Sequence, residues 1–321
     1  MKAVVIGGNG FIGTSLVERL LEQGVTVRIF DRYPSRFSEP FADVEYVTGE
    51  LGNHGDLEDA VRGMDWVFHL AYTTLPETSN DDPIHDVRSN VIDTIQLLEE
   101  CCKHGVKKFV FVSSGGTVYG VPREVPIRED HPTEPICSYG ITKLTIEKYL
   151  HLYHHLRGLD YVVARIANPY GERQNPKAKQ GVIGVFLGCI VDHQPLTIFG
   201  DGEVVRDFIY ISDAAASLVA CAEYKPGEDK AAPRVFNIGS GKGYSLNQIV
   251  DTVKQVVDED VKIHRVPARA VDVPSNVLDI DLALEHLDWR PRVDLKEGIE
   301  RAWQWIGTWQ KINQQPVLKQ D

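Results

Sequence analysis

A tyrosine and a lysine in the stretch CSYGITKLTIEKYL, Tyr139 and Lys143, have the spacing of a reactive pair. Residues four apart on a helix share one face, so the two side chains are neighbours if this stretch is helical. A free tyrosine has a pKa of about 10 and is a poor base at neutral pH. A nearby ammonium favours the phenolate, which can accept the proton of a hydroxyl group. An exposed Tyr/Lys pair has the same spacing, so the interpretation depends on the rest of the chain.

The stretch FVFVSSGGTVYG, residues 109–120, is a second place where chemistry is expected. Its first four residues are apolar or aromatic and predict a buried strand. Ser114 and Thr117 carry hydroxyls just beyond it, and Gly115 and Gly116 lie between them. Two glycines at the end of a strand are compatible with a phosphate cradle, a plain turn, or the floor of an active site.

Three glycines near the N-terminus, Gly7, Gly10 and Gly13, follow one apolar run and open a helical pattern. In this context Gly7 permits a tight turn, Gly10 lets the backbone approach a pyrophosphate, and Gly13 allows close helix–sheet packing. Asp31 ends the next apolar run, where a carboxylate binds ribose hydroxyls and repels a 2′-phosphate. The motif predicts a dinucleotide site that favours NAD, and Arg32 leaves NADP open. It also assigns the phosphates to Gly7, Gly10 and Gly13, so residues 113–116 are better interpreted as an active-site floor.

The elements that position these residues alternate between apolar runs and helical patterns. Strands are expected at 2–8, 26–31, 44–50, 66–71, 108–114 and 160–168, and helices at 11–23, 56–63, 84–105 and 138–157. Almost continuously apolar strands are typical of parallel strands covered on both faces. Repeated βα units therefore predict an α/β fold with a Rossmann-type doubly wound parallel sheet.

The pattern loosens after Pro169. Helices are expected near 182–193, 212–224, 246–257 and 295–311, with strands at 196–200 and 206–211. Ser245 and Gln248 have the spacing of a capping box at the start of one helix. We predict a Rossmann domain over 1–167, to which 208–240 returns, and a smaller C-terminal α/β substrate domain over 168–321.

Composition limits the partners. The net charge of −12 disfavours nucleic acid or an anionic membrane as the main partner. No apolar run reaches the length of a membrane span, and no signal peptide precedes the first strand, so a cytoplasmic protein is expected. The five cysteines have no metal-ligand spacing. Among His151, His154 and His155, the pair four residues apart could hold a metal, but no third ligand accompanies it, so we expect no metal site. His69 is expected to satisfy a core hydrogen bond.

Together these motifs resemble the extended short-chain dehydrogenase/reductase family, in its NAD-dependent epimerase/dehydratase branch. The resemblance extends from Met1 to about Trp309, and within the branch the pattern is most similar to the UDP-glucose (UDP-hexose) 4-epimerases. The quoted motifs that carry it are GxxGxxG, VFHLA, SSxxTVYG, YxxxK, RIANPYG, VRDFIYISDAA and FNIGSG. The resemblance implies that Tyr139 removes the O4 proton while the C4 hydride passes to NAD⁺. The resulting 4-keto sugar then rotates in the site and takes the hydride back on its other face.

The resemblance also implies roles for individual residues. Catalytic roles fall to Tyr139 and Lys143, with Ser114 or Thr117 supplying a hydroxyl. Cofactor contacts are expected from Gly7, Gly10, Phe11, Ile12, Gly13, Asp31, Arg32, Glu50, Leu51, Leu70, Ala71, Asn90, Ser113, Tyr139 and Lys143. Substrate contacts are expected from Gly115, Gly116, Asn168, Arg206, Arg269, Asp272 and Asn276. A homodimer through the helices at 84–105 and 138–157 is a mode the family often uses.

The chain departs from the family at Gly115, where epimerases usually carry Ser or Thr. Tyr139 could act alone, Ser114 or Thr117 could replace the hydroxyl, or the glycines could make room for a bulkier sugar. Dehydratases carry an Asp-Glu pair where this chain has Gly116 and Thr117, so dehydration is disfavoured. The position that often decides whether an N-acetyl group fits is Asn276, of intermediate size.

We therefore expect activity on UDP-glucose and UDP-galactose, with the N-acetylated pair tolerated. The alternatives are an epimerase of another nucleotide- or lipid-linked N-acetylhexosamine and an NAD-dependent nucleotide-sugar reductase or decarboxylase. A non-catalytic NAD-binding regulator is disfavoured by the intact Tyr139/Lys143 pair.

Overall fold

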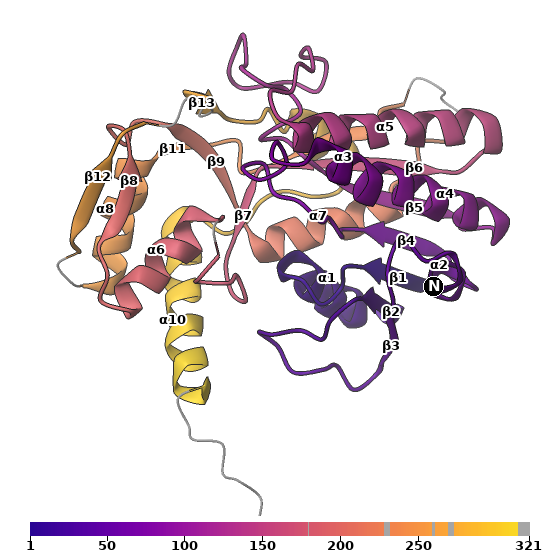
Figure 1. Ribbon diagram of the computed structural model, residues 1–321, viewed down its shortest axis with the longest axis horizontal. Coiled ribbons are helices and arrows are strands. Elements are labelled where there is room, and N and C mark those ends of the chain that lie inside the picture. Colours follow the sequence, from indigo (N-terminus) through magenta and orange to yellow (C-terminus); the bar gives the residue numbers. More distant parts are fainter. Residues whose placement is uncertain (179, 228–231, 259–260, 269–272, 314–321) are drawn as a thin grey trace, which may run out of the picture.

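Seven parallel strands form the central sheet of the computed structural model, which describes residues 1–313 except 179, 228–231, 259–260 and 269–272 (Figure 1). The strand order is β10-β6-β5-β4-β1-β2-β3. The strands are β1 (Lys2–Ile6), β2 (Thr26–Asp31), β3 (Val44–Thr48), β4 (Trp66–His69), β5 (Lys108–Ser114), β6 (Tyr161–Ile166) and β10 (Val235–Ile238). Every neighbouring pair is parallel.

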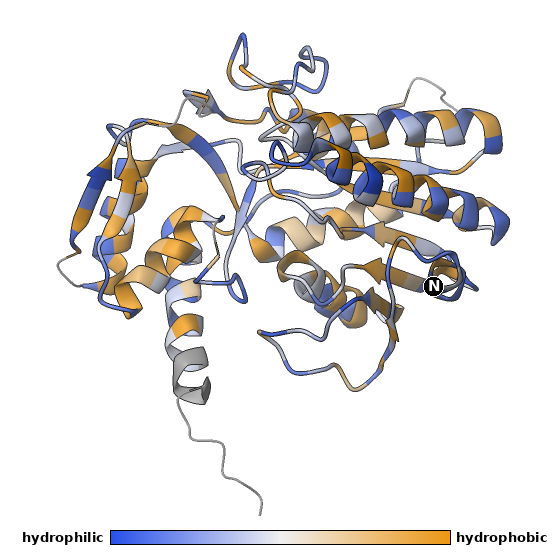
Figure 2. Ribbon diagram, in the orientation of Figure 1, coloured by the Kyte–Doolittle hydropathy of each residue, from blue (hydrophilic) through white to orange (hydrophobic). Residues whose placement is uncertain are grey.

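Helices cover both faces of this sheet, because its strands are apolar on both sides. In β1, Ala3 and Val5 pack into one buried cluster, while Val4 and Ile6 pack into another. The first cluster includes residues of α1 (Phe11–Glu22) and α7 (Ile211–Glu223). The second includes residues of α2 (His54–Val61), α4 (Asp93–Lys103) and α5 (Ser138–Arg157). Figure 2 shows the apolar strands between these layers. The predicted doubly wound α/β fold is confirmed.

A second lobe is built from two small sheets and its own buried cluster (Figure 1). In one sheet β9 (Val205–Tyr210) pairs with β7 (Asn168–Tyr170), β11 (Gly243–Ser245) and β13 (Ser275–Asn276). In the other, β8 (Leu196–Phe199) pairs with β12 (Ile263–Val266). The helices that contribute to this cluster are α6 (Val182–Val191), α8 (Leu246–Val257) and α10 (Leu295–Asn313). Helix α9 (Asp281–His286) packs against β10 of the large sheet. The capping box of Ser245 and Gln248 at the start of α8 is confirmed.

The chain crosses between the two lobes more than once. It leaves the large sheet after β6 and enters the second lobe at β7. It returns with α7, which packs against α1, and with β10, which pairs with β6 at the edge of the large sheet. Strand β9, at 205–210, belongs to the second lobe. The domain boundary at residue 167 stays a prediction.

Two expected elements are broken in the structure. The helix expected over 84–105 is divided into α3 (Pro83–Asp86), a π-helical segment (Val87–Ile92) and α4. The strand expected over 160–168 ends at Ile166, and Asn168 already begins β7 of the other sheet. The helix and the strand are therefore present as predicted, with the differences confined to a π-helical stretch and to the bounds. π-Helical turns occur frequently at functional sites.

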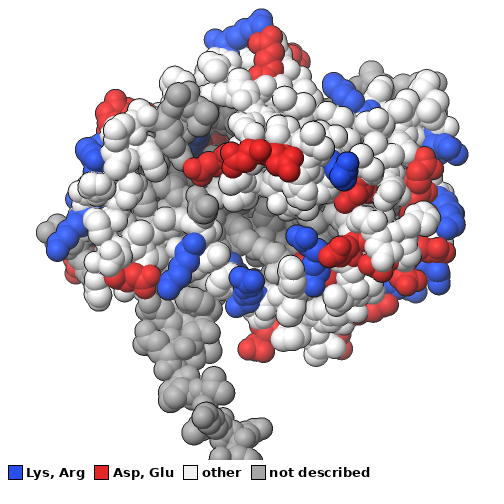
Figure 3. Space-filling view, viewed as in Figure 1, with Lys and Arg blue, Asp and Glu red and all other residues white. Residues whose placement is uncertain are grey.

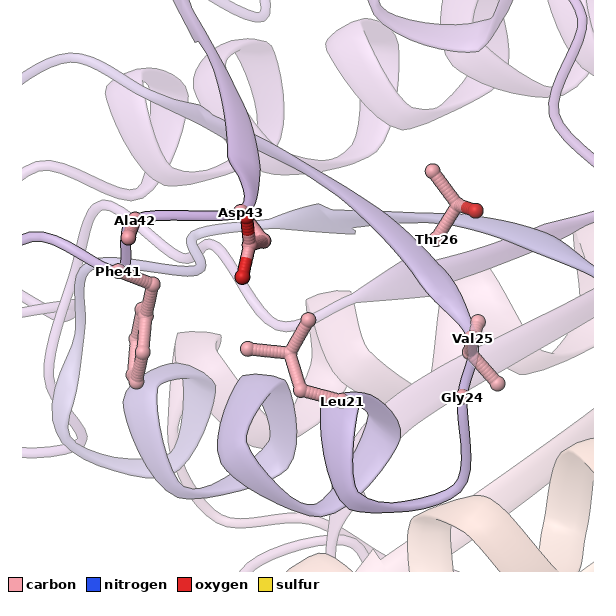
Figure 4. Close-up of a pocket in the computed structure, with 7 residues that line it drawn as sticks. All are labelled: Leu21, Gly24, Val25, Thr26, Phe41, Ala42 and Asp43. Carbon is pink, nitrogen blue, oxygen red and sulfur yellow. The ribbon is translucent and has the colours of Figure 1, made fainter.

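A surface hollow lies between the end of α1 and the residues that precede β3 (Figure 4). It is lined by Leu21, Gly24, Val25, Thr26, Phe41, Ala42 and Asp43. Ligands of parallel α/β sheets bind beyond the carboxyl ends of the strands. This hollow lies at the opposite end of β2, so it is separate from the site described below. Among the described residues, no helix is long and apolar enough to cross a membrane.

Candidate active site

The glycine loop after β1 has the geometry that a pyrophosphate needs. Gly7 has a φ of +86°, and a Cβ atom there would lie 2.8 Å from the Ala71 nitrogen. A Cβ on Gly13 would overlap the Gly7 carbonyl oxygen, so the turn and α1 pack as closely as the motif predicts. Gly10 is the N-cap residue of α1, and no side chain accepts a hydrogen bond there from the first N–H groups of the helix. The first N–H groups of the helix are therefore open to an anion, and these residues fit NAD.

Asp31 is held beside this loop at the carboxyl end of β2. Its Oδ2 accepts a hydrogen bond from the Asn9 nitrogen at 3.0 Å, and its Oδ1 accepts one from the Arg32 nitrogen at 2.8 Å. The exposed Arg32 guanidinium lies over the ring of Tyr33. A carboxylate fixed at this point fits the ribose hydroxyls of NAD.

Helix α5 begins with Tyr139 in its first turn because the loop after β4 caps it. The Ser138 nitrogen donates to Asn80 Oδ1 at 2.9 Å, and the Tyr139 nitrogen donates to Ser79 Oγ at 3.0 Å. Side chains from another segment thus satisfy N–H groups that a helix start leaves free. The hydroxyl of Tyr139 has no hydrogen-bond partner among the described residues. It is therefore available to a substrate.

Lys143 is buried one turn further along α5. Its side chain is 2% exposed, and Nζ donates to the Val112 carbonyl oxygen at 2.7 Å. Burial lowers the pKa of Lys143 to about 7, although the carboxylates of Glu147 and Asp86 oppose the shift. Burial also raises the pKa of Tyr139. In the chain by itself, burial therefore outweighs the expected effect of Lys143 on Tyr139.

A buried carboxylate, Asp86, joins the loop after β4 to α5. Its Oδ1 accepts hydrogen bonds from Thr74 Oγ1 at 2.5 Å and from Asn90 Nδ2 at 2.9 Å. Its Oδ2 accepts one from Ser138 Oγ at 2.6 Å. Asn90 in turn accepts a hydrogen bond from the Thr73 nitrogen at 3.0 Å. The Asn90 amide, expected to lie near the cofactor, is therefore held by Asp86 of α3 and by the backbone of Thr73.

Neither Asp86 nor Tyr72, which lies against Tyr139 and Lys143, was identified from the sequence. The Tyr72 and Tyr139 ring centroids are 4.7 Å apart. The signals available were an aromatic residue directly after the VFHLA motif and an acidic residue four positions before Asn90. Neither pattern indicates a contact with α5.

The strand end at 113–117 separates into a buried part and a part that faces the site. Ser113 Oγ donates to Glu147 Oε1 at 2.5 Å, so this hydroxyl is used inside the protein. Ser114 is half-buried, and its hydroxyl has no hydrogen-bond partner among the described residues. Thr117 Oγ1 is buried and likewise has no partner there. A Cβ on Gly116 would meet only Ser114 Oγ, at 3.9 Å.

Asn276 is fully buried beside this strand end. Its Nδ2 donates to the Gly115 carbonyl oxygen at 3.1 Å, while Oδ1 has no partner among the described residues. The structure therefore brings together Gly115 and Asn276, which are 161 residues apart in sequence.

The expected diphosphate contacts lie in the second lobe. Asn168 Nδ2 donates to the Asp207 carbonyl oxygen at 2.8 Å. Arg206 Nη1 donates to the carbonyl oxygens of Val205 at 2.8 Å and Val273 at 2.7 Å. Arg269 and Asp272 lie outside the described residues. Figure 3 shows a hollow in the face between the lobes, with acidic side chains above it and basic side chains below it.

The remaining expected cofactor contacts surround the ends of β1, β3 and β4. The Leu70 and Ala71 nitrogens both donate to the Ile6 carbonyl oxygen at 2.9 Å. Glu50 is exposed after β3, and Leu51 packs against the second buried cluster. Phe11 and Ile12, at the start of α1, pack against the cluster of the second lobe. Their roles stay predictions.

His69 is buried at the end of β4. Its Nε2 is 2.9 Å from Thr94 Oγ1, in agreement with the expected core hydrogen bond, although Nδ1 has no partner among the described residues. Burial lowers the pKa of His69 to about 3, so the ring is neutral at physiological pH.

Comparisons with known proteins agree with this geometry. The model of the NAD dependent epimerase/dehydratase family matches residues 3–239. A UDP-glucose 4-epimerase of Mycolicibacterium smegmatis is 33% identical over 309 residues, covering 94% of this chain and 97% of that protein.

Two solved structures have the same fold. A UDP-glucose 4-epimerase of Thermotoga maritima with UDP-glucose is 35% identical, with a TM-score of 0.90, and the match covers 96% of this chain and 99% of that one. A UDP-N-acetylglucosamine 4-epimerase of Methanobrevibacter ruminantium, in complex with UDP-N-acetylmuramic acid, is 28% identical, with a TM-score of 0.88 and coverage of 96% and 98%. These three proteins are 4-epimerases of different UDP-sugars, while a dTDP-4-dehydro-6-deoxyglucose reductase of Escherichia coli is 32% identical over 307 residues, covering 93% of this chain and 95% of that protein.

Proposed function

The chain belongs to the NAD-dependent epimerase/dehydratase family, and we propose that it is a UDP-hexose 4-epimerase that interconverts UDP-glucose and UDP-galactose. NAD is the cofactor of the family. The observation that carries the proposal is the free hydroxyl of Tyr139, which lies beside the buried Lys143 at the carboxyl ends of the parallel strands.

When bound by the glycine loop and Asp31, NAD would supply the redox chemistry, as acceptor and then donor of the C4 hydride of the sugar. The chain's own part is acid–base chemistry. Tyr139 accepts the O4 proton in the first half of the reaction and gives it back in the second. A positive charge on Lys143 stabilises the phenolate. Burial raises the pKa of Tyr139, so a positive charge beside it favours the proton transfer.

A hydroxyl for the sugar O4 comes from Ser114 or Thr117 in this proposal. Both side chains follow β5, and neither hydroxyl is engaged by another described residue. An unpaired buried hydroxyl such as that of Thr117 costs free energy unless a partner arrives. The absence of a carboxylate at Gly116 and Thr117 disfavours elimination of water from the sugar.

The N-acetylated pair of sugars is included as a second substrate. Asn276, the expected size-selecting residue, is smaller than tyrosine, and its Nδ2 donates a hydrogen bond to the Gly115 carbonyl oxygen. A solved structure of this fold belongs to a UDP-N-acetylglucosamine 4-epimerase, which favours tolerance of the N-acetyl group.

A homodimer is part of the proposal. The segment 83–92 and helix α5, which pack against each other, expose apolar side chains. Those with the largest exposed fractions are Ile84 (73%), Leu156 (64%) and Ile141 (51%). Apolar side chains on adjacent helices fit a second copy of the chain. Light scattering of the purified protein at several concentrations tests this association.

The activity is tested by incubating the purified protein with a panel of UDP-sugars and following inversion at C4 by NMR. Tyr139→Phe should lower the rate by about 10² to 10⁴, the typical contribution of a general base. The matched control is Tyr149→Phe on the same helix, which should keep full activity. Unchanged inversion in Tyr139→Phe would contradict the proposal. Net consumption of added NADH by the wild type would instead indicate a reductase.

A further inference from the structure

The ring of Tyr72 contacts both reactive side chains of α5. Its centroid is 4.7 Å from that of Tyr139, with the two rings edge to face. Lys143 Nζ lies 3.8 Å from the Tyr72 centroid, compared with 4.8 Å from Phe111 and 5.5 Å from Tyr139. Of these three rings, Tyr72 is therefore the nearest to the ammonium.

The hydroxyl of Tyr72 is linked through Thr142 to the buried carboxylate of Asp86. It shares a hydrogen bond with Thr142 Oγ1, which lies on α5 between Tyr139 and Lys143. Thr142 Oγ1 is in turn 3.2 Å from Asp86 Oδ2. The ring is therefore fixed at its hydroxyl end, and its face is presented to Lys143.

We propose that Tyr72 is a positioning residue, whose ring face holds the Lys143 ammonium next to Tyr139. The proposal rests on the 4-epimerase function proposed above. An ammonium over the face of an aromatic ring is attracted by the ring quadrupole, most strongly where water is excluded. Lys143 is 2% exposed, so this condition is met.

Other charges near Lys143 do not replace the ring. The titratable groups that face it from the surrounding elements are Glu147, Asp86, His69, Tyr139 and Tyr72. Among the described residues no carboxylate lies within ion-pair distance of Nζ. Glu147 is instead paired with Arg165, with Oε2 2.6 Å from Nη2. Because burial lowers the pKa of Lys143 to about 7, a modest interaction decides how much ammonium is present at neutral pH.

Two variants separate the ring from its hydroxyl. Tyr72→Phe keeps the aromatic face and loses only the hydrogen bond to Thr142. Tyr72→Leu keeps an apolar side chain and loses the face. Tyr224→Leu is the matched control, because that ring lies 6.0 Å from Lys108 Nζ in another part of the fold.

The first measurement does not depend on turnover. NMR titration of protein labelled with ¹⁵N at lysine Nζ gives the pKa of Lys143, assigned by loss of its signal in Lys143→Met. We expect a fall of about one unit in Tyr72→Leu and a much smaller change in Tyr72→Phe. Tyr224→Leu should leave the pKa unchanged. A Tyr72→Leu protein that titrates like the wild type would overturn the proposal, as would an equal fall in Tyr72→Phe.

The second measurement is the pH profile of kcat for C4 inversion. If the ammonium is required, the alkaline limb of this profile should move to lower pH in Tyr72→Leu by as much as the pKa of Lys143 falls. KM for the UDP-sugar should change less than about twofold. Rescue by Tyr72→Phe distinguishes positioning from general loss of packing. A wild type that inverts no UDP-sugar would refute the proposed function, while the NMR titration would still decide the role of Tyr72.

Discussion

The side chain of Leu278 occupies the position where a side chain at residue 115 would begin. A Cβ atom on Gly115 would lie 2.5 Å from Leu278 Cδ1 and 3.1 Å from the Arg165 carbonyl oxygen. Leu278 is fully buried, and its nitrogen is 3.4 Å from Asp207 Oδ2. Packing within the protein thus accounts for the glycine. A side chain on Gly115 would have to displace the end of Leu278, whereas Gly116 has open space, and the hypothesis that the two glycines make room for a larger sugar stays a prediction.

This relationship predicts the outcome of Gly115→Ser. The variant should lose about 1–3 kcal/mol of unfolding free energy through overpacking, and its epimerase activity should fall. Leu278→Ala makes room for the new side chain. The double variant should therefore lose less unfolding free energy than the sum of the two single losses, by about 1 kcal/mol or more. Urea unfolding of the four proteins of this cycle gives the coupling. Gly116→Ser is the control and should be tolerated, and strict additivity would refute the steric explanation.

The buried Lys143 predicts a pH dependence of stability. Its pKa is lowered from 10.5 to about 7 in the fold, so between these values the unfolded chain binds one more proton. Stability therefore increases with pH across this window. The wild type should gain unfolding free energy relative to Lys143→Met as the pH rises from 7 to about 10, and the difference should be constant below about 6. Denaturant unfolding at each pH checks this, and a difference independent of pH would contradict it.

Asn276 should govern the tolerance of N-acetylated sugars. Asn276→Ala removes the amide that holds the Gly115 carbonyl and widens the site beside it. The ratio of kcat/KM for UDP-N-acetylglucosamine over UDP-glucose should rise about tenfold, the range that a small change in pocket volume provides. Measuring both substrates in one protein cancels any general loss of stability. A ratio that stays at the wild-type value would exclude Asn276 as the selecting residue.

Asp31 should control the choice of cofactor. Asp31→Ser removes the carboxylate that accepts hydrogen bonds at the carboxyl end of β2. We expect the Kd for NAD⁺ to rise about tenfold or more and the Kd for NADP⁺ to fall, because the repulsion of the 2′-phosphate is gone. Calorimetric titration with each dinucleotide measures both. Glu50→Gln, at an exposed position after β3, is the comparison, and its preference for NAD⁺ should persist.

The parts of the fold that depend on neighbouring residues could be predicted from the sequence. Tyr139 and Lys143 share a helix face because their spacing matches the helical repeat, and Ser245 caps α8 because its partner is three residues away. The placement of Leu278 against Gly115 depends on packing between segments more than 160 residues apart, so no local pattern indicates it. The same holds for Tyr72, whose contact with α5 follows from how the loop after β4 folds back.

The last strand of the large sheet has a consequence for synthesis of the chain on the ribosome. Strand β10 covers 235–238 and α7 covers 211–223, so both emerge after a large part of the second lobe has been made. Until then the edge of β6 has no partner, and the face of α1 that α7 will cover is exposed. Unpaired edges and apolar faces of this kind bind other chains. A nascent chain that stops near residue 167 therefore presents an unpaired strand edge and an uncovered helix face, and both are covered only when residues 211–238 have been made.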